Sequence, residues 1–124
     1  MAFAMFSDQV RPRARVLVLE DEALISLMIE NVLVAAGYGV EVAASEQQAL
    51  AALDTHHFDM AVIDVGLGEG NSFKVAEALT QSKVEFIFCT ASSVPIIAPF
   101  LDVPVVDKPF TESDLLAAVA RQSA

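Results

Sequence analysis

Acidic and basic side chains stand directly behind several apolar runs of the sequence. Glu20 and Asp21 follow one run, Asp64 follows a second, and Lys108 follows another. Three carboxylates held close together repel one another unless a cation compensates, and an all-oxygen ligand set of this kind suits a hard ion such as Mg²⁺. A lysine ammonium can contact a phosphoryl oxygen as a point charge. These residue types therefore indicate a Mg²⁺-dependent phosphoryl-transfer site.

Asp64 lies centrally in this set and could act as the nucleophile, forming an aspartyl-phosphate. Thr90 closes a Phe-rich run and offers a hydroxyl that can donate to a further phosphoryl oxygen. Each residue also has an ordinary explanation, since Glu20 or Asp21 could cap a helix and Asp64 could open a turn before Gly66. These explanations are independent of one another, whereas one site explains all the residues together. We therefore favour the site.

Five runs of the sequence predict the strands that position these residues. Four runs are apolar almost throughout and predict strands buried on both faces of a parallel sheet, at 15–19, 60–63, 85–89 and 103–106. Residues 38–43 alternate between apolar and polar side chains, which predicts an edge strand. Helical apolar spacing predicts helices at 23–36, 46–55, 72–81 and 112–122. The carboxyl ends of parallel strands share one edge, so the polar residues should converge there.

Local signals mark the ends of the predicted helices. Ser45 with Gln48, and Thr111 with Asp114, match the spacing of capping boxes. Gly37 stands where a helix commonly ends on a left-handed residue. These signals support the assignment of the strands and helices on either side.

The connection from Ala91 to Asp102 breaks the regular alternation, because it contains Pro95 and Pro99. A proline inside a helix loses a backbone hydrogen bond, so we expect a shortened or irregular fourth helix there. Strand–helix alternation with short connections otherwise predicts an α/β fold with a doubly wound parallel sheet.

Length and charge limit the classes of function. The chain has 124 residues, 55% of them hydrophobic, and a net charge of −10, which predicts one globular domain and argues against nucleic acid or an anionic membrane as a partner. Its longest apolar stretch falls short of the ~18 residues that span a bilayer. A lone Cys89 fits a reducing compartment, so we expect a cytoplasmic protein. Residues 1–14 should form a flexible N-terminal arm and residues 15–122 the domain.

In their order along the chain, these motifs resemble a response-regulator receiver domain, the phospho-accepting half of two-component signalling. Residues 16–22 match the first strand and acidic pair of the family, and residues 61–64 match the phospho-acceptor strand. Thr90-Ala91 matches the hydroxyl switch position, and residues 107–110 match the lysine motif. The resemblance implies a flavodoxin-like (βα)5 fold, with a five-stranded parallel sheet in the order 2-1-3-4-5 flanked by helices.

The resemblance also implies a Mg²⁺ cofactor and a phosphoryl donor. Asp64 would take the phosphoryl group from the phosphohistidine of a sensor histidine kinase or a histidine phosphotransfer protein. Asp21, Asp64 and the Gly66 carbonyl would bind Mg²⁺ directly, and Glu20 would act through water. Such a protein is not an enzyme for a separate substrate, because it catalyses only its own phosphorylation and dephosphorylation.

The same resemblance assigns the groups that would hold the phosphoryl group. Lys108 would anchor it, and backbone N–H groups near Val65, Gly66 and Ala91 would help to bind it. Phosphorylation would pull Thr90 inward and reshape the nearby surface.

Two positions depart from the usual family pattern. Gly68 stands where most receivers carry Pro, and Val105 stands where a switch Tyr or Phe is usual. Together with Phe88-Cys89-Thr90 and the connection broken by prolines, these departures resemble the subgroup named for a Phe-Ala-Thr-Gly-x-Tyr (FAT GUY) stretch. Members of that subgroup usually answer histidine kinases of the HWE or related class.

We therefore expect a stand-alone receiver that signals by protein contacts or drains phosphate from a relay. The alternative is a pseudo-receiver, a constitutive interaction module whose site no longer turns over; the intact acidic, hydroxyl and lysine positions argue against it. A phosphatase of the haloacid-dehalogenase kind would need D-x-D after the first strand. Asp64-Val65-Gly66 follows the third run and lacks the second Asp, so this function is disfavoured.

Overall fold

The computed structural model describes residues 14–67, 72–91 and 95–123, and the predicted arm at 1–14 lies outside this part except for Ala14. Within the described residues, five parallel strands form one sheet in the order β2-β1-β3-β4-β5. The strands are β1 Arg15–Leu19, β2 Gly39–Ala43, β3 Met60–Ile63, β4 Glu85–Ala91 and β5 Val105–Lys108. The predicted α/β class and strand order are confirmed.

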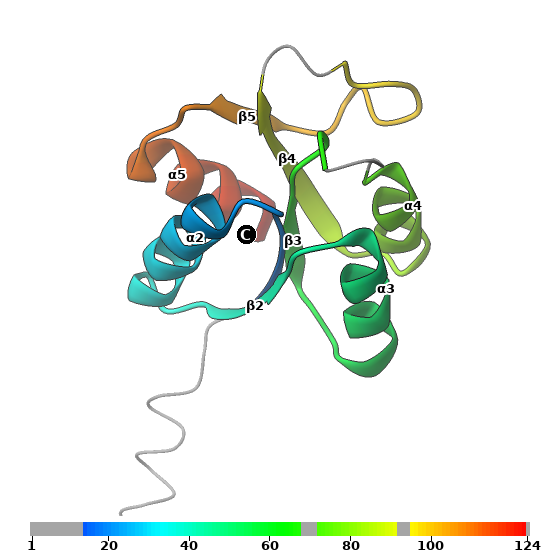
Figure 1. The fold of residues 1–124 in the computed structure, drawn as a ribbon, viewed down its shortest axis with the longest axis horizontal. Coiled ribbons are helices and arrows are strands. Elements are labelled where there is room, and N and C mark those ends of the chain that lie inside the picture. The colour runs from blue at the N-terminus through cyan, green and yellow to red at the C-terminus, as the bar shows by residue number, and fades with distance from the viewer. Residues whose placement is uncertain (1–13, 68–71, 92–94, 124) are drawn as a thin grey trace, which may run out of the picture.

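Helices cover both faces of this sheet. The described helices are α2 Ala23–Ala35, α3 Glu46–Thr55, α4 Phe73–Gln81 and α5 Glu112–Ser123. Helices α2 and α5 pack on one face, and α3 and α4 pack on the other (Figure 1). Parallel strands with helical crossovers therefore bury the sheet from both sides, as the apolar runs predict.

Alternation of side chains along each strand produces two separate apolar cores. In β1, Val16 and Val18 contribute to the core beneath α2 and α5, whereas Leu17 and Leu19 contribute to the core beneath α3 and α4. These residues are at most 1% exposed. The sheet is therefore a tightly packed support that fixes where each strand ends.

The predicted helix-end signals act as expected. The Gln48 N–H donates to Ser45 Oγ at 3.1 Å, and the Asp114 N–H donates to Thr111 Oγ1 at 3.0 Å. Gly37 adopts a φ of 99°, the left-handed region in which a side chain would be strained. Each signal stabilises a helix terminus next to a strand.

Strand β5 differs from its prediction in both position and burial. It begins at Val105 rather than at residue 103, and it extends to Lys108. Proline 104 has no N–H to donate to a neighbouring strand, which explains the later start. Because β5 is the second edge of the sheet, only Val106 is buried and Val105 is 41% exposed. The sequence pattern of a fully buried strand was wrong here.

The shortened or irregular fourth helix expected between Ala91 and Asp102 is not found in the described residues of this segment, which is held by aromatic packing instead. Residues 95–104 form turns and contain no helix, while residues 92–94 lie outside the described part. Phe100 is 5% exposed and stacks on Phe73 at 5.6 Å between ring centroids, with an interplanar angle of 7°. It also meets Phe86 and Phe88 edge-on at 6.2 Å. We call these four phenylalanines the aromatic cluster.

Helix α2 presents an unusually apolar surface. Leu24 is 83% exposed, Leu27 is 52% exposed and Val34 is 53% exposed. A hollow of about 490 Å³ runs between α2 and α5, with Leu27 and Leu116 in its lining. None of the described helices has the length and apolar character needed to cross a bilayer.

Candidate functional site

Three carboxylates from two strand ends meet at the carboxyl edge of the sheet. Glu20, Asp21 and Asp64 each offer one oxygen, and these oxygens lie within 4.8 Å of one another. Glu20 and Asp64 are 2% and 5% exposed, whereas Asp21 is exposed. An oxygen-only set with one side open to solvent suits Mg²⁺, which keeps several waters. The chemistry of these donors therefore fits the predicted ion.

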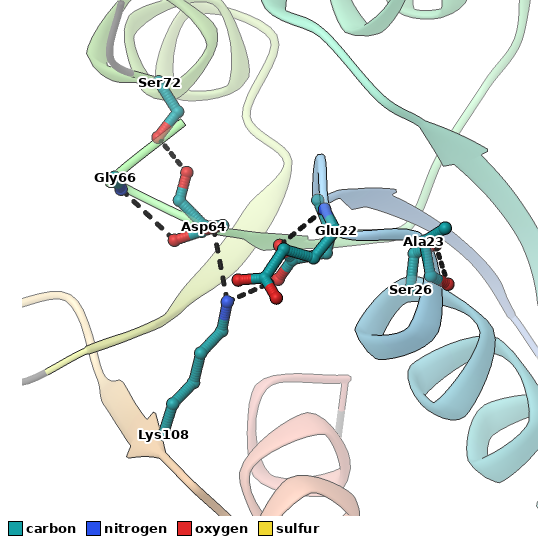
Figure 2. A network of polar contacts seen from close by, with 8 residues as sticks. Glu22, Ala23, Ser26, Asp64, Gly66, Ser72 and Lys108 are labelled. Carbon is teal, nitrogen blue, oxygen red and sulfur yellow. Dashed lines mark hydrogen bonds and ion pairs between the residues drawn. The ribbon is translucent and has the colours of Figure 1, made fainter. Parts of the chain in front are cut away.

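Lys108 reaches into this cluster from the end of β5. Its Nζ donates to Glu20 Oε1 at 2.7 Å and to Asp64 Oδ2 at 3.3 Å (Figure 2). The lysine side chain is 15% exposed, so these ion pairs are only weakly screened by solvent. The structure thus brings the predicted lysine against two of the three predicted acids.

The protonation of Glu20 reflects its enclosed position. Burial, reinforced by the charge of Asp64, raises the pKa of Glu20 from 4.5 to about 7, although the hydrogen bond from Lys108 opposes the shift. Partial burial works to lower the pKa of Lys108, but the hydrogen bond to Glu20 and the charge of Asp64 outweigh it, and the pKa rises. Without a metal, the site therefore holds more carboxylate than its one lysine stabilises.

The backbone and side chain of Asp64 are tied to different parts of the fold. Its N–H donates to the Leu19 carbonyl at 2.9 Å, and its Oδ1 accepts a hydrogen bond from the Gly66 N–H at 3.2 Å. Val65 is buried, whereas Gly66 is exposed beside Asp64. Of the predicted ligand and phosphate-binding positions on this loop, Gly66 thus lies directly against the Asp64 side chain, and Val65 joins the two in the chain. The atypical Gly68 lies outside the described residues.

Thr90 combines complete burial with an unused hydroxyl. It is 1% exposed, and within the described part of the chain its Oγ1 is the buried side-chain polar atom that has no hydrogen-bond partner. The register places Ile63 opposite Phe88 and Ala91 opposite Lys108, so Thr90 and Ala91 extend β4 at the same edge as Asp64. Leaving a buried hydroxyl unpaired costs free energy of folding, so the Thr90 hydroxyl is available to form a hydrogen bond with a ligand.

Two other residues complete the account of the site. Burial raises the pKa of the Cys89 thiol to about 12, so Cys89 is an unreactive core residue, as its apolar run indicates. Ser72 was not singled out from the sequence, where it is the first residue of the helix predicted at 72–81. In the structure it is buried, and its Oγ donates to the Asp64 carbonyl at 2.7 Å.

The fold and this edge of the sheet define a CheY-like protein of the flavodoxin type, with acidic and basic groups gathered where β1, β3 and β5 end. The model of the response regulator receiver domain matches residues 16–120. The chain therefore belongs to the family of response-regulator receiver domains of two-component signalling.

Several solved structures are similar to this chain. SdrG from Sphingomonas melonis Fr1 is 35% identical, with a TM-score of 0.77, and the match covers 89% of this chain and 96% of SdrG. The receiver domain of PhyR from Erythrobacter litoralis is 28% identical, with a TM-score of 0.79 and 90% of each chain covered. The chemotaxis response regulator CheY4 of Vibrio cholerae is 28% identical, with a TM-score of 0.77 and coverages of 87% and 97%. Comparison with curated proteins found no match.

Proposed function

We propose that this chain is a receiver whose Asp64 accepts a phosphoryl group from the phosphohistidine of a sensor histidine kinase or a histidine phosphotransfer protein. An Asp64 carboxylate oxygen bonds to phosphorus while the phosphorus–nitrogen bond breaks and the imidazole leaves. The observation that carries this proposal is the gathering of Glu20, Asp21 and Asp64 within 4.8 Å, with Lys108 Nζ against Asp64. Residues 15–122 act as one unit that catalyses only its own phosphorylation and dephosphorylation.

Asp21, Asp64 and the Gly66 carbonyl would hold Mg²⁺ directly, with Glu20 acting through water. When bound, Mg²⁺ offsets the negative charge that the acceptor and the phosphoryl group bring together. The buried Glu20 orients Lys108, because it accepts a hydrogen bond from the lysine at 2.7 Å. The Lys108 ammonium is therefore held beside Asp64 before the phosphohistidine arrives, which avoids reorganisation of the site during transfer.

Three kinds of hydrogen-bond donor would bind the phosphoryl oxygens. The Lys108 ammonium offers a charge-assisted hydrogen bond, and Thr90 offers a buried hydroxyl without a partner among the described residues. Backbone N–H groups near Val65, Gly66 and Ala91 add to this set. A phosphoryl group would thus satisfy the unpaired Thr90 hydroxyl and draw the end of β4 towards the site.

The output is a protein contact or the removal of phosphate from a relay, within the cytoplasm. An exposed Val105 replaces the usual switch aromatic, and turns occupy residues 95–104, so the response would involve that segment rather than an aromatic rotation in β5. These features, with Phe88-Cys89-Thr90, support membership of the FAT GUY subgroup and a donor kinase of the HWE or related class. The alternative, a constitutive pseudo-receiver, does not explain why the buried Thr90 hydroxyl is unpaired, because no phosphoryl group would bind it.

Intact-mass measurement tests the proposal directly. Incubation with acetyl phosphate and Mg²⁺ should add one phosphoryl group to the wild-type chain and none to Asp64→Asn. Asp54→Asn is the matched control, because Asp54 is exposed on α3, and it should be modified like the wild type. A phosphate mapped to any residue other than Asp64 would contradict the assignment, and an unmodified wild type would favour the pseudo-receiver.

A further inference from the structure

Ser72 joins the start of α4 to the backbone of the acceptor residue. Its side chain is fully buried at 0% exposed, and its Oγ donates to the Asp64 carbonyl at 2.7 Å. Figure 2 shows Ser72 and Lys108 approaching Asp64 from opposite sides, the serine at the main chain and the lysine at the carboxylate. Ser72 therefore touches the acceptor without entering the group of ligands and charges.

This hydrogen bond is not the usual use of a serine at a helix start. An N-cap serine ordinarily accepts a hydrogen bond from an N–H in the first turn. Ser45 does so for α3, accepting from the Gln48 N–H at 3.1 Å, and Thr111 accepts from the Asp114 N–H at 3.0 Å. Ser72 occupies the N-cap of α4 but makes no such bond. Its hydroxyl serves the Asp64 carbonyl instead of its own helix.

The carbonyl that Ser72 binds belongs to the peptide group joining Asp64 to Val65. A trans peptide is planar, so its N–H points opposite to its carbonyl. Holding the Asp64 oxygen therefore also fixes the direction of the Val65 N–H. The Asp64 N–H is held as well, because it donates to Leu19 at 2.9 Å. The acceptor is thus anchored on both sides along its main chain.

The aromatic cluster holds Ser72 from the other side. Phe73 is the first residue of α4, and its ring stacks on that of Phe100. Its edge also meets Phe88 of β4 at 6.1 Å. These contacts keep the start of α4 in place, so the serine hydroxyl meets the Asp64 carbonyl with little freedom to move.

We propose that Ser72 is a positioning residue for phosphoryl transfer, acting through the Asp64–Val65 peptide. This inference rests on the function proposed above. With the Ser72 hydroxyl present, the Val65 N–H keeps the direction needed to donate a hydrogen bond to a phosphoryl oxygen. Without the Ser72 hydroxyl, the Asp64–Val65 peptide can rotate, and the Val65 N–H must be oriented again during each phosphoryl transfer.

Rates of phosphorylation by acetyl phosphate at saturating Mg²⁺ provide the test. Ser72→Ala should lower the rate about fivefold to tenfold, the effect of losing one hydrogen bond, while the Mg²⁺ dissociation constant stays within about twofold. Thr80→Val is the matched control, because Thr80 Oγ1 donates to the Ala76 carbonyl at 2.9 Å on the same helix, away from the site. It should leave the rate unchanged.

Ser72→Thr separates positioning from stability. It keeps the hydroxyl but adds a methyl group at a fully buried position, so it should lower the melting temperature while keeping the wild-type rate. If the rate instead follows stability across these variants, Ser72 is a structural residue and the proposal is overturned. Ser72→Cys tests the same point without a cavity, because a thiol is a weak donor, and a full wild-type rate in it would also overturn the proposal.

The Val65 amide resonance offers a second measurement. Beryllofluoride with Mg²⁺ mimics a bound phosphoryl group and should shift the Val65 amide in the wild type, and shift it less in Ser72→Ala. Equal shifts in the two proteins would contradict the proposal. A wild type that takes no phosphoryl group at all would contradict the proposed function, whereas equally fast wild type and Ser72→Ala would contradict only the role of Ser72.

Discussion

Two buried regions meet along β4, and they are built on opposite principles. The site at the end of the strand encloses Glu20, Asp64 and Thr90, with an unpaired hydroxyl and a carboxyl whose pKa is raised by burial. The aromatic cluster beside it is fully apolar, with every ring against at least two others. One region lowers the stability of the fold, and the other raises it.

The two regions are linked at neighbouring residues. Ser72 contacts Asp64 while Phe73 joins the cluster, and Phe88 of the cluster lies two residues before Thr90. A site with unsatisfied polar groups persists only where its surroundings determine its geometry. The aromatic cluster therefore secures the part of the chain on which the site depends. Changes to each region should therefore have separable effects.

Removing Phe100 should have the largest effect on stability. Phe100→Ala takes a buried ring out of the cluster, and such a change costs about 3–5 kcal/mol of the free energy of unfolding. Denaturant unfolding measures this loss. Ile97→Ala is the control, because Ile97 is 49% exposed in the same segment and should change stability by less than about 1 kcal/mol. Similar losses in both variants would mean that the segment is not held by the cluster.

Removing the Lys108 side chain should lower the rate of phosphorylation more than it lowers the affinity for Mg²⁺. Lys108→Ala should slow phosphorylation by about 100-fold, the effect of losing a preorganised cation, while Mg²⁺ binding stays largely intact. Rates and Mg²⁺ titrations measure the two effects. Lys74→Ala, at an exposed position of α4, should leave both unchanged. Equal losses of metal binding and phosphorylation would contradict these separate roles.

The raised pKa of Glu20 predicts a pH dependence in EDTA. Its pKa is about 7 in the folded chain and 4.5 in the reference state, so between these values the folded state binds more protons. The free energy of unfolding should therefore fall as pH rises through that window, by at most about 1.4 kcal/mol per pH unit from this group. Unfolding of wild type and Glu20→Gln at several pH values measures it. The two proteins should differ in slope, and parallel curves would exclude Glu20 as the cause.

Removing one charge from the site should have the smallest effect. In EDTA, Asp64→Asn should melt at a higher temperature than the wild type, because it relieves repulsion with Glu20. The corresponding gain in the free energy of unfolding should be about 1 kcal/mol or less. The wild type should gain about 2.7 kcal/mol from Mg²⁺ at a hundredfold excess over its dissociation constant, and the variant should gain less. Four melting curves test this. A variant that melts lower in EDTA and gains equally would refute the three-carboxylate metal site.

Short-range patterns in the sequence predicted much of this architecture. Buried strands, the Ser45 cap and the left-handed Gly37 depend on neighbouring residues, so local spacing reveals them. The meeting of Glu20 with Lys108 also followed, because parallel strands end at one edge.

Features that depend on distant contacts could not be read in the same way. The apolar run at 103–106 indicates a buried strand, but its exposure depends on β5 being an edge. Stacking of Phe100 on Phe73 joins residues far apart in the chain, and no local period encodes it. Ser72 stands at the start of a predicted helix, and only the position of the Asp64 carbonyl reveals the partner of its hydroxyl.

The apolar surface of α2 also governs how the molecules behave towards one another in solution. Leu24, Leu27 and Val34 are more than half exposed, which favours self-association. At neutral pH the net charge of −10 opposes it by keeping molecules apart. Near the isoelectric point of 4.3 this repulsion vanishes while the leucines remain exposed. We therefore expect colloidal stability to be lost on acidification, before all of the carboxylates of the chain have been protonated.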